Sequence, residues 1–288
     1  DDLSGGFEDN VPEGAKFVRG SILDVPLLER IFAEHRITHV YHLAAYAAEN
    51  LSHFIKRYNY ETNLIGSVNL INLSVNHGVR CFVFTSSIAV YGAGTPPFTE
   101  DLQPEPEDSY GIAKYAVEQE LAASAAMFGL NYVVFRPHNV YGEHQNIGDR
   151  YRNVVGIFMN QIMKGEPMTI FGDGKQTRAF THVDDVAPVI ARSAFMEECY
   201  GETFNVGSDA PCEVNQLAHI VAHEMGVEPR IKYCEDRSEV KHAYSEHSKC
   251  IASFGDLIRG IQLEEGVARM AEWVREVGVR ESRRFEGV

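Results

Sequence analysis

The sequence predicts an α/β fold in which helices cover both faces of a doubly wound parallel sheet. Short apolar runs alternate along the chain with longer amphipathic runs, which is the pattern of consecutive βα units. The run that ends at Thr85 begins with four apolar residues, as expected for a strand buried on both faces of a parallel sheet. Beyond residue 139 the strand-like runs become shorter and loops more frequent. We therefore expect one lobe at residues 1–138 and a smaller α/β lobe at residues 139–288.

The individual elements follow from the same patterns. The predicted strands of the first lobe are residues 16–18, 39–43, 81–85 and 131–135. Amphipathic periodicity predicts helices at residues 25–35, 60–77, 109–127, 154–164, 184–196, 214–225 and 263–277. Residues 96–108 are rich in proline and acidic side chains, which indicates a surface loop.

Composition excludes several classes of function. The 288 residues include 26 basic and 41 acidic side chains, a net charge of −15, so the chain lacks the basic surface that nucleic acid requires. An anionic substrate must therefore be bound by a few local arginines. The five cysteines are scattered without a Cys-x-x-Cys pair, which indicates free thiols in a reducing compartment, and we expect a cytoplasmic protein. No apolar run approaches the roughly 20 residues that span a bilayer, so no membrane partner is expected.

Tyr110 and Lys114 are the strongest indication of chemistry in the chain. Residues four apart share one face of a helix, so the Lys114 ammonium is expected beside the Tyr110 phenol. A neighbouring cation stabilises a phenolate and lowers the pKa of the phenol from its usual value of about 10. Such a tyrosine can take a proton from a sugar or alcohol hydroxyl. The pair therefore predicts oxidation of an alcohol with a nicotinamide cofactor.

The setting of this pair supports the catalytic interpretation over an ordinary helix surface. Ser86 and Ser87 follow the predicted strand that ends at Thr85, and open α/β sheets bind ligands at the carboxyl ends of their strands. The Ser87 hydroxyl could hold the same substrate oxygen as Tyr110. The alternative is that both serines merely cap backbone amides at the strand end.

Further motifs occur in a fixed order along the chain. They are Asp1-Asp2-Leu3-Ser4-Gly5-Gly6, His42-Leu43-Ala44-Ala45, Asn63-Leu64-Ile65-Gly66-Ser67, Thr85-Ser86-Ser87-Ile88-Ala89-Val90-Tyr91-Gly92, Arg136-Pro137-His138-Asn139-Val140-Tyr141-Gly142, Phe171-Gly172-Asp173-Gly174, Arg178-Ala179-Phe180, Val183-Asp184-Asp185-Val186 and Phe204-Asn205-Val206-Gly207. With these motifs the chain resembles the extended short-chain dehydrogenase/reductases. Within them it is most similar to the NAD-dependent sugar-nucleotide epimerase/dehydratase family and its UDP-sugar 4-epimerases.

The resemblance implies a Rossmann-like sheet, NAD as cofactor and a UDP-sugar as substrate. It assigns NAD binding to residues 1–138 and sugar-nucleotide binding to residues 139–288. It also implies a homodimer through a four-helix contact made by residues 60–77 and 109–127.

The resemblance further implies a set of cofactor-binding residues. Asp1 and Asp2 would bind the adenosine ribose, and Ser21 and Ile22 would lie at the edge of the adenine. The remaining residues of this set lie nearer the nicotinamide or let the backbone approach the cofactor: Leu43, Ala44, Ala45, Asn63, Ser86, Tyr110, Lys114 and Pro137. The alternatives are a tight strand end at residues 43–45 and a solvated helical asparagine at Asn63.

The implied substrate-binding residues lie mostly in the second lobe. They are Ser87, Asn139, Asn153, Thr169, Phe171, Arg178, Arg237 and Glu239. Arg178 and Arg237 would clamp the diphosphate, because the guanidinium fork fits phosphate oxygens. Thr169 and Phe171 would flank the uracil, and Glu239 would accept a hydrogen bond from the ribose.

Three positions bear on the reaction and the substrate. Ile88 and Ala89 follow Ser87 where the dehydratases and decarboxylases of the family carry acids, so the resemblance favours reversible oxidation at C4, that is, epimerisation. Ala243 occupies a position where a bulky tyrosine restricts some epimerases to unacetylated hexoses, so a small residue favours tolerance of N-acetyl sugars.

The glycine turn that normally receives the dinucleotide pyrophosphate does not occur in the sequence. Asp1 matches the acidic residue that follows the second strand of the family, so we expect a βαβ portion of about thirty residues to be absent before it. Either the chain is a fragment or the protein lacks this unit, and we favour the fragment. We expect the chain expressed alone to bind NAD poorly and to aggregate or fold loosely.

Two alternative functions remain open at this point. A net NAD(P)-dependent oxidoreductase of nucleotide sugars would accumulate reduced cofactor, and a truncated, non-catalytic relative would turn over nothing. His219 and His223 are four residues apart, but no Glu follows His219 as in the His-Glu-x-x-His motif, so we expect no metal site.

Overall fold

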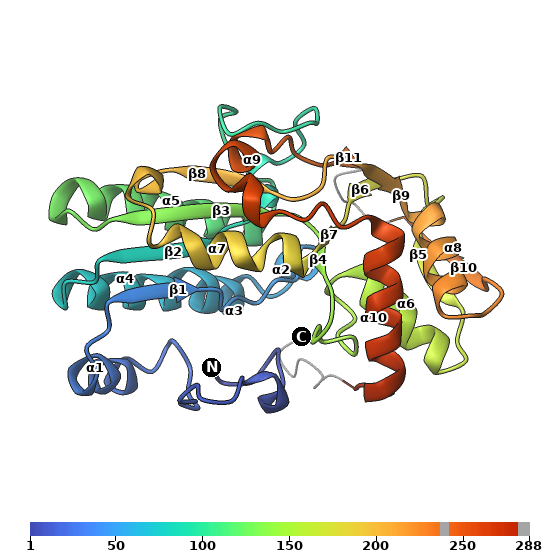
Figure 1. The fold of residues 1–288 in the computed structure, drawn as a ribbon, viewed down its shortest axis with the longest axis horizontal. Helices are drawn as coiled ribbons and strands as arrows, with labels where there is room; N and C mark the ends of the chain where they lie inside the picture. The colour runs from blue at the N-terminus through green and yellow to red at the C-terminus, as the bar shows by residue number, and fades with distance from the viewer. Residues whose placement is uncertain (237–241, 282–288) are drawn as a thin grey trace.

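A four-stranded parallel sheet forms the centre of the molecule. The computed structural model describes residues 1–236 and 242–281 of the chain (Figure 1). The sheet has the strand order β1-β2-β3-β8, and every neighbouring pair is parallel. Its strands are β1 His39–His42, β2 Cys81–Thr85, β3 Tyr132–Pro137 and β8 Thr203–Val206. The predicted α/β class with a parallel, doubly wound sheet is confirmed.

Helices cover both faces of this sheet because its strands are apolar on both faces. Phe82 and Phe84 of β2 lie in one buried cluster with Leu121 of helix α5. Cys81 and Val83, which alternate with them, lie in a second buried cluster with side chains of α7 and α9. The first face is covered by α1 Val25–Glu34, α4 Gly66–Asn76 and α5 Ser109–Phe128; the second by α7 Ala187–Ser193 and α9 Ser248–Phe254.

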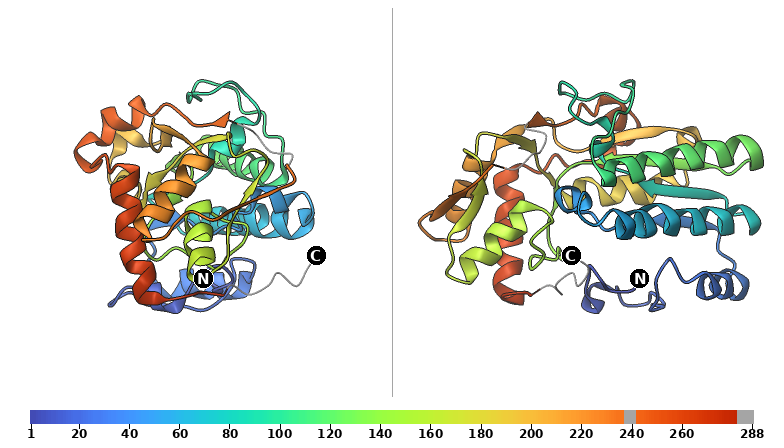
Figure 2. Two further views of the ribbon diagram at one scale, coloured as in Figure 1. Left: turned by 90° about the vertical axis from the view of Figure 1, so that its right-hand side faces the viewer. Right: turned by 180° about the vertical axis from the view of Figure 1, so that it is seen from behind.

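A second lobe lies beyond the carboxyl ends of the strands, with a core of its own (Figure 1). Its helices are α6 Val154–Met163, α8 Val214–Glu224 and α10 Leu263–Val277. Its small sheets pair β4 Val140–Tyr141 with β7 Thr181–His182, and β5 Met168–Phe171 with β10 Ile231–Cys234. A third sheet has the order β11-β6-β9, formed by His242–Ala243, Thr177–Ala179 and Pro211–Glu213. Between these elements the chain returns to the first sheet as α7, β8 and α9, as two further views show (Figure 2).

Two predicted elements differ from the structure. Residues 16–18 form no strand, so that prediction is wrong; backbone hydrogen bonds tie Val18 and Gly20 to Asp1 instead of to a sheet. The helix predicted at 60–77 is divided into α3 Lys56–Tyr60, a π-helical turn Glu61–Ile65 and α4. The π turn contains the buried Asn63, whose side chain holds the loop after β1, and such turns are frequent at functional sites.

Shorter helices complete the architecture. The helix predicted at 184–196 is α7 preceded by the 3₁₀ turn Val183–Asp185, and Pro188 lies in the first turn of α7. Further short helical segments are α2 Glu49–Ser52 and the 3₁₀ turns Glu8–Asn10, Ile88–Tyr91, Glu197–Cys199 and Gly255–Leu257. Among the described helices, none has both the length and the apolar character needed to cross a bilayer.

Candidate active site

Helix α5 begins directly beside the end of strand β2. Asp108 caps the helix: its Oδ1 accepts hydrogen bonds from Tyr110 N at 2.8 Å and Gly111 N at 2.9 Å. Gly111 then faces the turn that follows Ser87, where a Cβ would lie 2.6 Å from the Ala89 carbonyl oxygen. Glycine at this position therefore permits the close approach that brings the first turn of α5 to the strand end.

Ser87, Tyr110 and Lys114 meet at this strand end, as the sequence predicts. Ser87 is hydrogen bonded to the Tyr110 phenol. Lys114 Nζ donates to the Thr85 carbonyl oxygen at 2.7 Å and lies 5.8 Å from the centroid of the Tyr110 ring. Both side chains are buried, Tyr110 at 8% and Lys114 at 2% exposure. A buried ammonium and a buried phenol on successive turns of one helix are unusual outside functional sites.

Burial dominates the electrostatics of this pair. It raises the pKa of the Tyr110 phenol above its ordinary value, while the hydrogen bond from Ser87 lowers it. It also lowers the pKa of Lys114 to about 7, against an opposing effect of the Glu118 carboxylate. The direction for Tyr110 is opposite to the one expected from the sequence, because desolvation of the phenolate outweighs the two effects that lower its pKa, the Ser87 hydrogen bond and the Arg152 charge.

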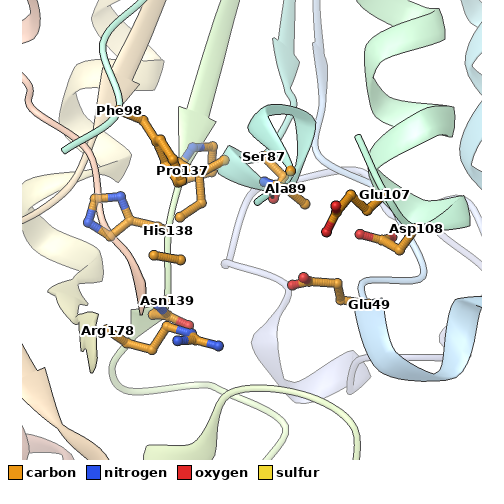
Figure 3. Close-up of a pocket in the computed structure, with 13 residues that line it drawn as sticks. Glu49, Ser87, Ala89, Phe98, Glu107, Asp108, Pro137, His138, Asn139 and Arg178 are labelled. Atoms are coloured by element: carbon orange, nitrogen blue, oxygen red, sulfur yellow. Dashed lines mark hydrogen bonds between the residues drawn. The ribbon is translucent and has the colours of Figure 1, made fainter. Parts of the chain in front are cut away.

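A cavity opens in front of Ser87, between the sheet and the second lobe (Figure 3). Ser87, Pro137, Asn139 and Arg178 line it, so the structure brings together four predicted residues from three segments of the chain. Figure 3 shows Arg178 and Asn139 on one side of the cavity and the acidic residues Glu49, Glu107 and Asp108 on the other. Ala243 also lines the cavity. His138, Glu49 and Glu107 also line the cavity but were not predicted as site residues; His138 lies in the quoted motif that begins at Arg136, and no local pattern marks the two glutamates.

Two of the predicted substrate residues of the second lobe, Asn139 and Arg178, line the cavity. Asn139 adopts a positive φ of 41°, a strained conformation that is frequent at functional sites, and its Nδ2 donates to the Ala179 carbonyl oxygen at 3.1 Å. Arg178 Nη1 donates to the Thr177 carbonyl oxygen at 2.9 Å.

Three other predicted substrate residues are not among the described residues that line this cavity. Asn153 caps α6 through Val155 N, Thr169 is bonded to Gln161, and the Phe171 carbonyl accepts from Gln176. Arg237 and Glu239 lie outside the described residues.

The predicted cofactor residues mostly hold the loops around the strand ends. Asn63 Oδ1 accepts from Tyr46 N at 2.8 Å and its Nδ2 donates to Tyr46 O at 3.1 Å, which fixes the loop after Leu43-Ala44-Ala45. Asp1 and Asp2 are exposed, and their carboxylates accept hydrogen bonds from Leu3 N and Ser4 N.

The predicted adenine-edge residues lie between α1 and α4. Ser21 Oγ accepts from Leu23 N at 3.1 Å, and Ile22 packs against Gly66, where a Cβ would collide with its side chain. Ser86 points away from the cavity toward Glu118, to which its hydroxyl donates.

Sequence reasoning missed a buried polar network behind the site. Arg136 of β3 forms an ion pair with Glu118 of α5, Nη2 to Oε2 at 2.6 Å, and both side chains are 6% exposed. Arg136 Nη1 donates to Tyr91 Oη at 2.8 Å. The signal in the sequence is that Glu118 follows Tyr110 and Lys114 at the same four-residue interval, which places it on the same face of the helix.

The residues present fit the nicotinamide side of a dinucleotide. The described hydrogen bond of Lys114 uses one of the three protons of its ammonium, which leaves donors for hydroxyl groups at the end of β2. Ala44 and Ala45 present small side chains at the end of β1. No residue of the chain is assigned to the pyrophosphate, because the sequence has no glycine turn of the usual form.

A doubly wound parallel sheet with serine, tyrosine and lysine converging at one strand end defines the class of short-chain dehydrogenase/reductases. Residues 1–207 match the NAD dependent epimerase/dehydratase family, and the chain belongs to this family. It is an NAD-dependent enzyme of the epimerase type with a Rossmann-like fold, so the predicted family, enzyme class and cofactor are confirmed.

Similar proteins include several 4-epimerases. The chain is 32% identical to a putative UDP-glucose 4-epimerase of Methanocaldococcus jannaschii, over 96% of this chain and 89% of the relative. It is 30% identical to a UDP-glucuronate 4-epimerase of Thermodesulfobacterium geofontis, over 92% and 80%. The crystal structure of the Thermotoga maritima UDP-glucose 4-epimerase with UDP-glucose is 34% identical, with a TM-score of 0.90 over 96% of this chain and 90% of the other. Decarboxylases and dehydratases of nucleotide sugars are also similar.

Proposed function

We propose that this enzyme interconverts the C4 epimers of a UDP-hexose through a 4-keto intermediate. The observation that carries the proposal is the contact of Ser87 and Tyr110 beside Lys114 at the carboxyl end of β2. The two residues after Ser87 are Ile88 and Ala89, which offer no acid for elimination or decarboxylation. The 4-epimerases among the similar proteins support the same reaction.

The side chains at the strand end divide the proton transfer between them. NAD, when bound, would supply the hydride acceptor and donor for C4 of the sugar. Tyr110 Oη takes the proton of the C4 hydroxyl. Ser87 Oγ, which is hydrogen bonded to Tyr110, binds the same C4 oxygen. The Lys114 ammonium offsets the phenolate charge that forms on Tyr110. Once the keto sugar presents its other face, the hydride would return to C4 and Tyr110 would return its proton to the C4 oxygen, so epimerisation is completed without net oxidation.

The opposite wall of the cavity is suited to the nucleotide diphosphate. Arg178 and Asn139 lie there, and a guanidinium binds phosphate oxygens in a fixed geometry. Asn153, Thr169, Phe171, Arg237 and Glu239 remain proposed contacts of the nucleotide. Ala243 lines the cavity with a small side chain, so we include N-acetylated hexoses among the substrates.

One observation favours a second candidate, 4,6-dehydration of the sugar. Glu49 and Glu107 are exposed carboxylates at the cavity, and a carboxylate can remove the C5 proton of a 4-keto sugar. Dehydratases are also among the similar proteins. A 4-keto-6-deoxy product would identify this reaction.

The test is to incubate the protein and NAD with UDP-glucose, UDP-GlcNAc and UDP-glucuronate and to identify the products by proton NMR. We expect an equilibrium mixture of C4 epimers from one or more of the three and no accumulation of reduced NAD. Tyr110→Phe should lower turnover by at least about 100-fold because it removes the acid–base group. Tyr115→Phe on the same helix is the matched control, since its hydroxyl contacts only Gln103 among the described residues. Reduced NAD in proportion to product would contradict epimerisation.

We also infer that the protein is a homodimer and that its two lobes bind different ligands. Ile112, Met127 and Phe128 are exposed on α5, and Ile65 is exposed at the end of the π turn before α4, which supports a contact between copies through these helices. We assign NAD to residues 1–138 and the sugar nucleotide to residues 139–288. Light scattering of the purified protein would measure the number of copies.

A further inference from the structure

Glu118 is a buried acid that the proposed reaction does not use. It lies on α5 one turn after Lys114 and two turns after Tyr110, so all three side chains share one face of the helix. Its carboxylate is paired with Arg136 through two contacts, Nη2 to Oε2 at 2.6 Å and Nε to Oε1 at 3.1 Å. A buried acid and base are costly to retain for stability alone, because apolar residues of similar size often serve as well.

The three residues of α5 each hold one of three consecutive residues at the end of β2. Tyr110 is hydrogen bonded to Ser87, and Lys114 Nζ donates to the Thr85 carbonyl oxygen at 2.7 Å. Glu118 Oε1 accepts from the Ser86 hydroxyl between them. The position of Ser87 relative to Tyr110 is therefore set by contacts on both of its preceding residues.

The Glu118–Arg136 ion pair is also connected to the wall of the cavity by a series of hydrogen bonds. Arg136 Nη1 donates to Tyr91 Oη at 2.8 Å, and Tyr91 Oη donates to Asn205 Oδ1 at 2.8 Å. Asn205 Nδ2 then donates to the Phe98 carbonyl oxygen at 3.1 Å, and Phe98 lines the cavity. The ion pair thus joins the catalytic helix, the end of β2 and one wall of the cavity.

The titratable groups around Lys114 lie on β1, β3 and helix α5. His42 of β1 is buried, and desolvation, together with Lys114, lowers its pKa to about 3, so it is neutral. Burial raises the pKa of the Tyr110 phenol, and Arg136 on β3 is engaged with Glu118. The Glu118 carboxylate is the acidic group that raises the pKa of Lys114 against the effect of burial.

We propose that Glu118 is a positioning residue of this site, which fixes Ser86 and Ser87 against Tyr110 and favours the ammonium form of Lys114. For its effect on turnover the proposal rests on the 4-epimerase function inferred above. Its effect on Lys114 does not depend on which reaction the enzyme catalyses.

The test compares Glu118→Gln with Glu120→Gln, which changes an exposed acid on the same helix. We expect Glu118→Gln to lower kcat roughly 10- to 100-fold with a smaller change in KM, since displaced catalytic groups cost about this much. Loss of the carboxylate lowers the pKa of Lys114 further, so the alkaline limb of the pH–rate profile should move to lower pH. Glu120→Gln should match the wild type in kcat and in the position of the limb.

A second measurement follows the protonation of Lys114 directly and does not depend on turnover. NMR titration of lysine-labelled protein, with Lys114 assigned by Lys114→Met, should show the Lys114 titration at lower pH in Glu118→Gln than in the wild type or Glu120→Gln. If both the Lys114 titration and the alkaline limb are unchanged in Glu118→Gln, the proposal is overturned. A shifted titration with no epimerisation of any UDP-hexose would instead overturn the proposed function alone.

A double variant separates positioning from folding. Glu118→Met with Arg136→Leu removes the pair without leaving an unpaired buried charge, so it should fold even if Glu118→Gln does not. We expect its turnover to stay at least about tenfold below the wild type, because Ser86 has lost its acceptor. Wild-type turnover and pH profile in the folded double variant would show that the pair is only structural.

Discussion

At the residue scale, burial decides the chemistry of the catalytic pair. The spacing of Tyr110 and Lys114 predicts their contact, and the structure places them within reach of each other. The spacing could not predict the direction of the Tyr110 pKa, because that depends on how completely the strand end excludes water. Glu118 was equally visible in the sequence, but its partner Arg136 lies on another element, and only the fold brings them together.

The low pKa of Lys114 predicts a pH-dependent stability. The folded protein releases the Lys114 proton near pH 7, whereas the unfolded chain keeps it to about pH 10.4. Between these values the unfolded state binds more protons, so the contribution of Lys114 to stability becomes more favourable as pH rises, by at most about 1.4 kcal/mol per pH unit. Lys114→Met should therefore be more stable than the wild type at pH 7, and its advantage should shrink toward pH 10. Urea unfolding of both proteins across this range measures the difference; a constant difference would contradict the prediction.

At the scale of elements, local signals predicted the helices and strands that carry the site. Helix α5 begins after its cap Asp108 and ends before Gly129, which has a positive φ of 72°, close to the predicted bounds. Strand β2 has the predicted bounds because its apolar run is uninterrupted. The prediction of a strand at residues 16–18 was wrong because a strand forms only when a neighbouring strand is there to pair with it. The π turn around Asn63 was missed because it depends on contacts with Tyr46.

The segment before α10 is held by one carboxylate, which predicts a large effect of its removal. Asp185 accepts backbone hydrogen bonds from Arg259 at 2.6 Å, Gly260 at 3.1 Å and Ile261 at 2.8 Å. Asp185→Ala leaves these donors without the carboxylate and should lower the free energy of unfolding by about 3 kcal/mol. The neighbouring Asp184 forms a partly exposed ion pair with Arg269, so Asp184→Ala should cost less than about 1 kcal/mol. Equal losses in urea unfolding would refute the role assigned to Asp185.

At the scale of the whole molecule, the sheet was predictable and the cavity was not. A parallel sheet with helices on both faces follows from the alternation of runs along the chain. The cavity combines residues 49, 87, 107, 138 and 178, which no sequence interval connects. The first sheet also contains β8 and packs against α7 and α9, so residues beyond 139 contribute to the core of the first lobe.

Two buried histidines, one in the sheet and one between the sheet and the second lobe, predict that the whole fold loses stability in acid. His42 lies in the sheet, where its Nε2 is hydrogen bonded to Ser67 Oγ at 2.7 Å, and burial lowers its pKa to about 3. His138 lies between the sheet and the second lobe, bonded to Ser245 and to the Ser208 carbonyl, and burial lowers its pKa to about 4. The unfolded chain protonates both histidines below about pH 6.5, whereas the folded protein does not. Stability must therefore fall as pH drops from about 6.5 toward 4, by up to about 1.4 kcal/mol per pH unit for each.

Single variants assign this acid sensitivity to each histidine. His42→Gln and His138→Gln should each reduce the slope of unfolding free energy against pH between pH 4.5 and 6, because each removes one proton taken up on unfolding. His223→Gln removes an imidazole whose side chain is 84% exposed and should keep the wild-type slope. The slope is the informative quantity, since either buried substitution also changes packing by an amount that does not vary with pH. A wild-type slope in both buried variants would mean that acid unfolding is governed by the carboxylates instead.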